Sequence, residues 1–167
     1  MVDTVEVQER SRTIAFTFDD LMRYHGGHSP GGVAVAFKAM RRAFPLLSPG
    51  NPPARRDINV RTAFRGPGCR DGFEVVTRAV SDGRYVVDRA LVRTDRGRLL
   101  EDFVFVVTLA ERTTTLLLRE GFVTDEFINL ARTDDRNDAE ELRLVDLKAQ
   151  LAERVISSPT RDVFDAV

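Results

Sequence analysis

The residues best suited to chemistry lie in two segments rich in glycine and proline. Both histidines of the chain, His25 and His28, stand in the first segment, YHGGHSPGG at positions 24–32. The only cysteine, Cys69, stands in the second, RGPGCRDG at positions 65–72. Because imidazole and thiolate bind zinc and other divalent transition metals, these three residues predict a metal site. Water in the fourth coordination position would leave that site open to catalysis.

Each of these residues also has other interpretations. Histidines next to glycines often form local hydrogen bonds, and a lone cysteine is commonly a small buried residue. As an enzyme residue, Cys69 would be a nucleophile with His25 as its base, because a helix start and flanking arginines favour the thiolate. The turn at Gly66–Gly68 could instead hold an anion at the start of a helix. The residues alone do not decide whether the protein is an enzyme.

The first segment leads into a long predicted helix. Pro30 suits the first turn, where its missing N–H costs nothing. Apolar residues then recur at helical spacing as far as Pro45 or shortly beyond it. These apolar residues are Val33, Phe37, Met40, Phe44 and Leu47. A shorter helix before the segment is expected to stop at Gly26.

The second segment leads into another predicted helix, for which Asp71 and Glu74 have the spacing of a capping box. An alternating stretch over residues 57–64 predicts a strand before this helix. Three more strands are expected after it, at residues 84–93, 99–109 and 113–118. The breaks between these three are short enough for hairpins, so they should be antiparallel neighbours. Both helices would pack on one sheet, and we therefore expect the two glycine-rich segments to meet.

These elements predict an α+β fold in which helices pack on one mixed sheet. Their order is helix, strand, helix, three strands and then C-terminal helices. Residues 1–133 would form the domain, and residues 134–167 a helical tail that follows a polar linker. The tail carries an amphipathic stripe, Leu144, Leu147, Leu151 and Val155. This stripe would either pack on the core or form a contact between two copies of the chain, and a homodimer is the expected assembly.

The composition excludes several classes of protein. The chain has 167 residues, of which 43% are hydrophobic, and its net charge is −1, so a sizeable core is possible without a strongly charged surface. Such a charge predicts no binding to nucleic acid or to a membrane surface. One cysteine excludes an intrachain disulfide. We find no signal peptide and no membrane span, so a cytoplasmic protein is expected.

At the two glycine-rich segments the sequence resembles the formylmethanofuran dehydrogenase E-subunit family, which includes stand-alone bacterial members. That family has histidine-glycine-histidine-any-cysteine-proline-glycine before a long helix and glycine-cysteine-threonine before a second helix. This chain has HGGHSPG at residues 25–31 and GCR at residues 68–70. The resemblance covers about residues 18–120 and implies a fold likened to the catalytic domain of glyceraldehyde-3-phosphate dehydrogenase. It also matches His25 and Cys69 with residues of the family's metal site.

Two positions depart from the family pattern. Gly27 stands in place of the second histidine, with His28 one residue later, and Ser29 stands in place of the first cysteine. The resemblance therefore implies a site of His25 and Cys69, with or without His28, or a site that has lost its metal. Three functions remain open from the sequence. They are a metal- or small-ligand-binding protein, a non-catalytic accessory module that docks through the tail helix, and a thiol enzyme that uses Cys69.

Overall fold

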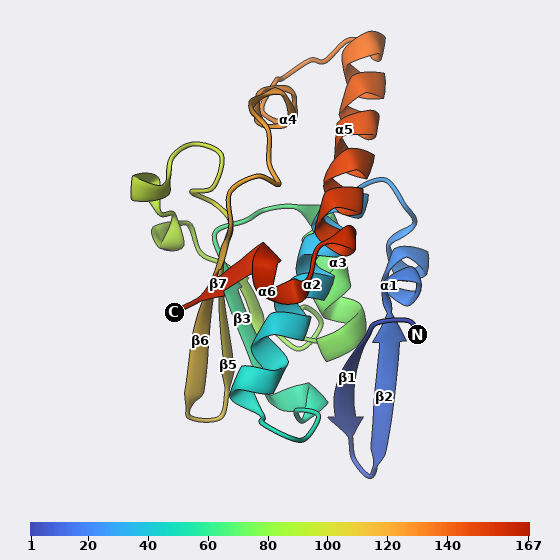
Figure 1. Cartoon of the computed structure of the whole chain (residues 1–167), viewed down its shortest axis with the longest axis vertical. Helices are drawn as coiled ribbons and strands as arrows, with labels where there is room; N and C mark the ends of the chain where they lie inside the picture. Colours follow the sequence, from blue (N-terminus) through green and yellow to red (C-terminus); the bar gives the residue numbers. More distant parts are fainter.

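The computed structural model describes residues 1–167 and confirms the predicted α+β fold, with six α-helices and two sheets. An antiparallel hairpin formed by β1 (Thr4–Glu9) and β2 (Arg12–Thr17) lies on one side of the central helices. A five-stranded sheet lies on the other side of them (Figure 1). The central helices are thereby covered from both sides.

The larger sheet has the strand order β4-β3-β5-β6-β7. Its strands are β3 (Ile58–Thr62), β4 (Tyr85–Val87), β5 (Val104–Leu109), β6 (Arg112–Leu118) and β7 (Phe164–Ala166). β3 and β4 run parallel while the other neighbours are antiparallel, so the sheet is mixed as predicted. Ile58, Val60 and Thr62 of β3 are buried on one face, in the predicted alternation.

The strand predicted at residues 84–93 needs correction. Only Tyr85–Val87 is extended, and it pairs in parallel with β3 instead of forming an antiparallel hairpin with β5. After Asp88 the chain forms two short 3-10 helices, Arg89–Leu91 and Thr94–Arg96. The Asp88 carboxylate accepts the N–H of Ala90, which turns the chain out of the sheet. The predicted β5–β6 hairpin is confirmed, but the strand predicted at residues 99–109 begins only at Val104.

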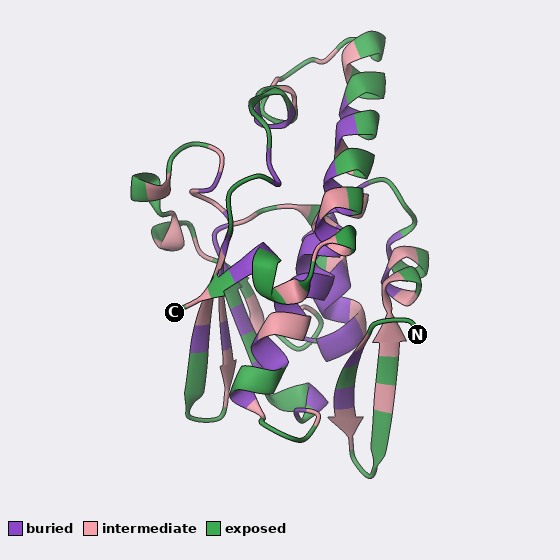
Figure 2. Ribbon diagram, in the orientation of Figure 1, coloured by how far each residue is buried: buried purple, intermediate pink, exposed green.

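Helix α2 (Pro30–Leu47) runs through the middle of the molecule and packs against α3 (Pro67–Thr77), α5 (Asp138–Ser157) and the larger sheet. It begins at Pro30 as predicted, and its predicted apolar residues are all buried. Pro45 lies in its last turn, so the helix ends shortly after this proline. Figure 2 shows that the buried residues gather on α2 and its neighbours. The core is therefore built around α2.

Helix α3 begins earlier than predicted. Its first residue is Pro67, so Asp71 and Glu74 lie inside the helix and do not form the predicted capping box. Glu74 instead accepts hydrogen bonds from the N–H and the hydroxyl of Ser81, at 2.8 and 2.6 Å. The early start places Cys69 within the first turn of the helix, where the helix packs against the core.

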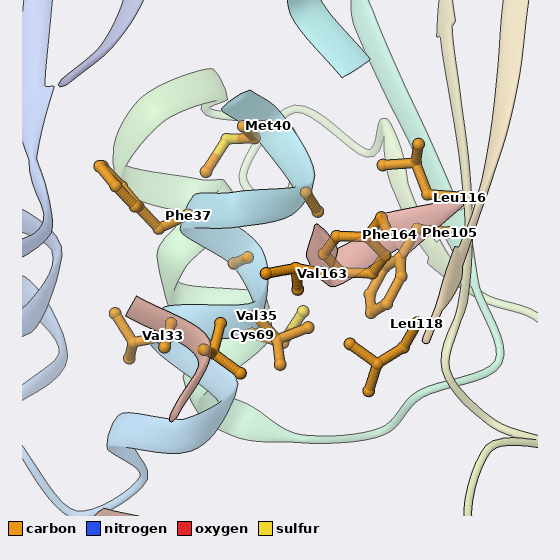
Figure 3. Packing of buried hydrophobic residues seen from close by; sticks show 14 of the residues in the cluster. Val33, Val35, Phe37, Met40, Cys69, Phe105, Leu116, Leu118, Val163 and Phe164 are labelled. Carbon is orange, nitrogen blue, oxygen red and sulfur yellow. The ribbon is translucent and has the colours of Figure 1, made fainter. Parts of the chain in front are cut away.

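The C-terminal segment completes the core. The apolar stripe of α5 is buried, and α5 packs against α2, so this stripe serves packing within the chain. After α5, helix α6 (Thr160–Val163) leads into β7, which pairs with β6 as the last strand of the sheet. Phe164 of β7 meets Phe105 of β5 edge to face, with 5.8 Å between the ring centroids (Figure 3). None of the helices combines the length and apolar character that crossing a membrane requires.

Candidate functional site

The two glycine-rich segments meet as expected, because α2 and α3 begin side by side. A methyl group added at Gly68 would lie 2.2 Å from the carbonyl oxygen of Ser29. One added at Gly32 would lie 2.8 Å from the backbone nitrogen of Cys69. Both distances are shorter than real side chains tolerate, so only glycine permits this close backbone approach. The glycines hold the two helix starts together.

The side chain of His25 joins the starts of α2 and α3 through two hydrogen bonds. His25 is the last residue of α1 (Phe18–His25), which ends at Gly26 in the left-handed conformation, as predicted. Its Nδ1 lies 2.7 Å from a carboxylate oxygen of Asp71 in α3, and its Nε2 accepts the N–H of Ser29 at 3.0 Å. Because Nε2 accepts a hydrogen bond, the ring proton is on Nδ1, which donates to Asp71. Both ring nitrogens therefore make hydrogen bonds. Neither has a free lone pair that could bind a metal ion or accept a proton.

The three predicted metal ligands do not converge. The exposed ring of His28 lies beside that of His25, with 4.6 Å between the centroids. Cys69 is fully buried, and its sulfur lies among the apolar side chains between α2 and the sheet (Figure 3). The structure contains no group of three or more His, Cys, Asp or Glu side chains that could hold a metal ion. Zinc binding at these residues thus stays a prediction that the geometry does not support.

We expect the Cys69 thiol to be unreactive in the folded protein. Burial raises its pKa to about 12, so the thiol stays protonated at neutral pH and lacks the nucleophilic thiolate. Iodoacetamide should alkylate the folded chain roughly a thousandfold more slowly than the unfolded chain, in proportion to the thiolate fraction. Mass spectrometry with and without denaturant measures both rates, and the single cysteine makes the signal unambiguous. Equal rates would show that the thiol is accessible after all.

A cavity of about 720 Å³ opens at the junction of the two segments. Its other walls come from residues 98–103, from α4 (Asp125–Ala131) and from α5. Apolar side chains line much of it, among them Val35, Phe64, Phe103, Phe127, Leu144 and Leu151. The volume falls within the range of small-molecule sites, about 300–1,000 Å³. The cavity is therefore large enough for an organic ligand of moderate size.

Positive charge predominates in the cavity, although the whole chain is nearly neutral. Six cationic side chains line it, namely Arg65, Arg89, Arg98, Arg132, Arg136 and Lys148. Only two carboxylates do so, Glu101 and Asp102, which leaves an excess of four cationic groups. A concave surface with apolar walls concentrates the field of such an excess. The cavity should therefore attract anions.

The cations differ in how firmly they are held. Arg89 lies 3.1 Å from Asp102 and Arg132 lies 3.4 Å from Glu101, although Oδ1 of Asp102 is buried without a hydrogen bond. Arg98 donates to Asn129, and Arg136 pairs with Glu141. Arg65 and Lys148 form no ion pair. Burial lowers the pKa of Lys148, and nearby Arg136 lowers it further, while Glu141 opposes both. A bound anion would raise this pKa again, so anion binding and protonation of Lys148 should favour each other.

The chemistry of this cavity has to be inferred from its own residues. Neither a family model nor a curated protein matches the chain. The resemblance to the formylmethanofuran dehydrogenase E-subunit family thus stays a prediction. The predicted site residues form one wall of the cavity through His28 and the glycine-rich turns, whereas the arginines of the opposite wall were missed. No spacing in the sequence connects those arginines with the two segments.

Proposed function

We propose that this protein binds a small organic anion in the cavity between α2, α3, α4 and α5. The observation that supports this function is the combination of an apolar lining with an excess of four cationic side chains. A carboxylate or phosphate attached to an apolar body would satisfy both features. The apolar body would contact Phe64, Phe103 and Phe127, while the anionic group would be balanced by the cations. The proposal concerns binding and includes no reaction.

The other functions have less support in the geometry. A thiol enzyme would need Cys69 as a thiolate, but this thiol is buried and protonated. An accessory module docking through α5 would need a free apolar stripe, but the predicted stripe packs on α2. A homodimer also stays a prediction.

If the cavity binds organic anions, the charge of the ligand should contribute more to its affinity than the apolar body does. We expect 2-naphthoate and 2-naphthyl phosphate to bind saturably, and the neutral 2-naphthamide to bind at least about tenfold more weakly, because it lacks charge-assisted hydrogen bonds. Affinity for the two anions should fall as salt is added. Titration calorimetry, supported by naphthalene fluorescence, measures these affinities.

Two variants provide the controls. Arg98→Gln combined with Arg132→Gln removes two cations of the cavity and should weaken binding of 2-naphthoate. Arg112→Gln removes an exposed charge at the start of β6, outside the cavity, and should leave the affinity unchanged. Equal affinity for the acid and the amide, or no saturable binding of either anion at millimolar concentration, would contradict the proposed function.

A further inference from the structure

The two helices that begin at the cavity differ from α1, α4 and α5. Neither α2 nor α3 has a side-chain hydrogen bond at its N-cap or an acidic residue in its first turn. By contrast, α1, α4 and α5 each have both features. The first N–H groups of a helix have no acceptor within the helix and carry partial positive charge. The starts of α2 and α3 thus present unpartnered donors where a ligand would lie.

Ser29 provides an independent indication of a ligand at this place. It lines the cavity and is only 7% exposed, yet its hydroxyl makes no hydrogen bond within the protein. Serine at an N-cap usually accepts a hydrogen bond from the first turn of its helix, which does not happen here. Its own N–H is held by His25, so the position of the residue is fixed. The hydroxyl therefore has no partner within the protein and keeps access to the solvent of the cavity.

We propose that the junction of Ser29–Gly32 with Gly66–Gly68 is the subsite for the oxyanion of the ligand. The Ser29 hydroxyl and the free N–H groups at the starts of α2 and α3 would donate to a carboxylate or a phosphate. Arg65, which lines the same part of the cavity, would add positive charge, and His28 beside it would add a ring N–H donor. This inference rests on the proposed function, and it adds where the charged group lies and which groups bind it.

The opposite wall is less suited to hold the oxyanion. Its arginines already have partners: Arg89 donates to the carbonyl of Ala63, Arg98 to Asn129, and Arg132 to Glu101. An oxyanion bound to these arginines would have to compete with an existing partner. Lys148 of the same wall has no partner, but burial lowers its pKa and so disfavours its charged form. The backbone donors of the junction are rigid and unpartnered, so they lose little freedom when they bind. We infer that the arginines attract the anion and that the junction holds it, with the apolar body directed towards α4 and α5.

Two substitutions of Ser29 test the subsite, with 2-naphthoate as the probe. Ser29→Asp places a carboxylate at the start of α2, where it should cap the helix and raise the melting temperature. The same carboxylate should occupy the subsite and weaken binding on the order of a hundredfold. Ser29→Ala removes one hydrogen bond to the anion and should weaken binding about tenfold. A more stable protein that no longer binds the anion cannot be explained by misfolding.

The control is Ser157→Asp, which adds the same charge at an exposed position near the end of α5 and should not alter binding. Wild-type affinity in both Ser29 variants, together with lost binding in the Arg98→Gln, Arg132→Gln variant, would overturn the subsite and leave the proposed function standing. Failure of wild type to bind any anion would overturn both. The ratio of affinities for 2-naphthyl phosphate and 2-naphthoate identifies the preferred oxyanion. Inorganic phosphate should compete with 2-naphthoate only if the junction binds phosphate.

Discussion

Replacing Gly68 with alanine is expected to destabilise the protein by about 3 kcal/mol and to abolish binding of 2-naphthoate. The added methyl would lie 2.2 Å from the carbonyl oxygen of Ser29. That atom belongs to the backbone and cannot rotate away, so the starts of α2 and α3 would have to separate. Separation would disturb the packed core between them and move the donors of the proposed subsite apart. Chemical denaturation gives the free energy of unfolding, and titration gives the affinity.

Gly31→Ala is a matched control for this substitution. Gly31 also lies in the first turn of α2 and lines the cavity. Its added methyl would lie 2.8 Å from the end of the Leu151 side chain and 3.3 Å from the backbone oxygen of Lys148, so the closest atom belongs to a side chain and not to the backbone. We expect this variant to lose no more than about 1 kcal/mol of stability. It is a control for stability only, because Gly31 belongs to the proposed subsite. If Gly68→Ala proved as stable as Gly31→Ala, the two helix starts would not be in the tight contact described above.

The elements that the sequence predicted correctly are those whose signals are local. Apolar spacing after Pro30 marks α2, and the alternation of Ile58, Val60 and Thr62 marks β3. The start of α3 was mistaken because two local signals competed. Pro67 suits the first position of a helix, while Asp71 and Glu74 suit a capping box. The structure uses the proline, and the carboxylates take distant partners that no local pattern reveals.

The sequence predicted only one wall of the cavity, the wall formed by the two glycine-rich segments. The expectation that the two segments meet, which rested on both helices packing on one sheet, is confirmed. The sequence also showed a high density of glycine in both segments. The physical cause of this density, the close approach of two backbones, becomes visible only with the fold. The direction of the Cys69 side chain depends on where α3 begins, and the structure agrees with the interpretation of Cys69 as a small buried residue. The opposite wall comes from residues 98–103, α4 and α5, which become neighbours of Ser29 only through tertiary packing.

Replacing His25 with alanine should lower the free energy of unfolding by about 3 kcal/mol, because it leaves a cavity and an unpaired N–H at Ser29. The imidazole is fully buried and joins α1 to the starts of both α2 and α3. Loss of this link should also weaken binding of 2-naphthoate, since Ser29 would no longer be held in place. Denaturation curves and the naphthoate titration measure the two effects.

His28→Ala is the control for His25→Ala, because it also removes an imidazole but at an exposed position. The His28 ring is exposed and makes no hydrogen bond, so its loss should change stability by no more than about 0.5 kcal/mol. Asp71→Asn retains an acceptor for the Nδ1–H of His25 and should cost only about 1 kcal/mol. A metal site would give another pattern, because a chelator would then destabilise the wild type and leave His25→Ala unaffected. Insensitivity of the wild type to EDTA, combined with a large loss in His25→Ala, would assign His25 to the junction between the three helices.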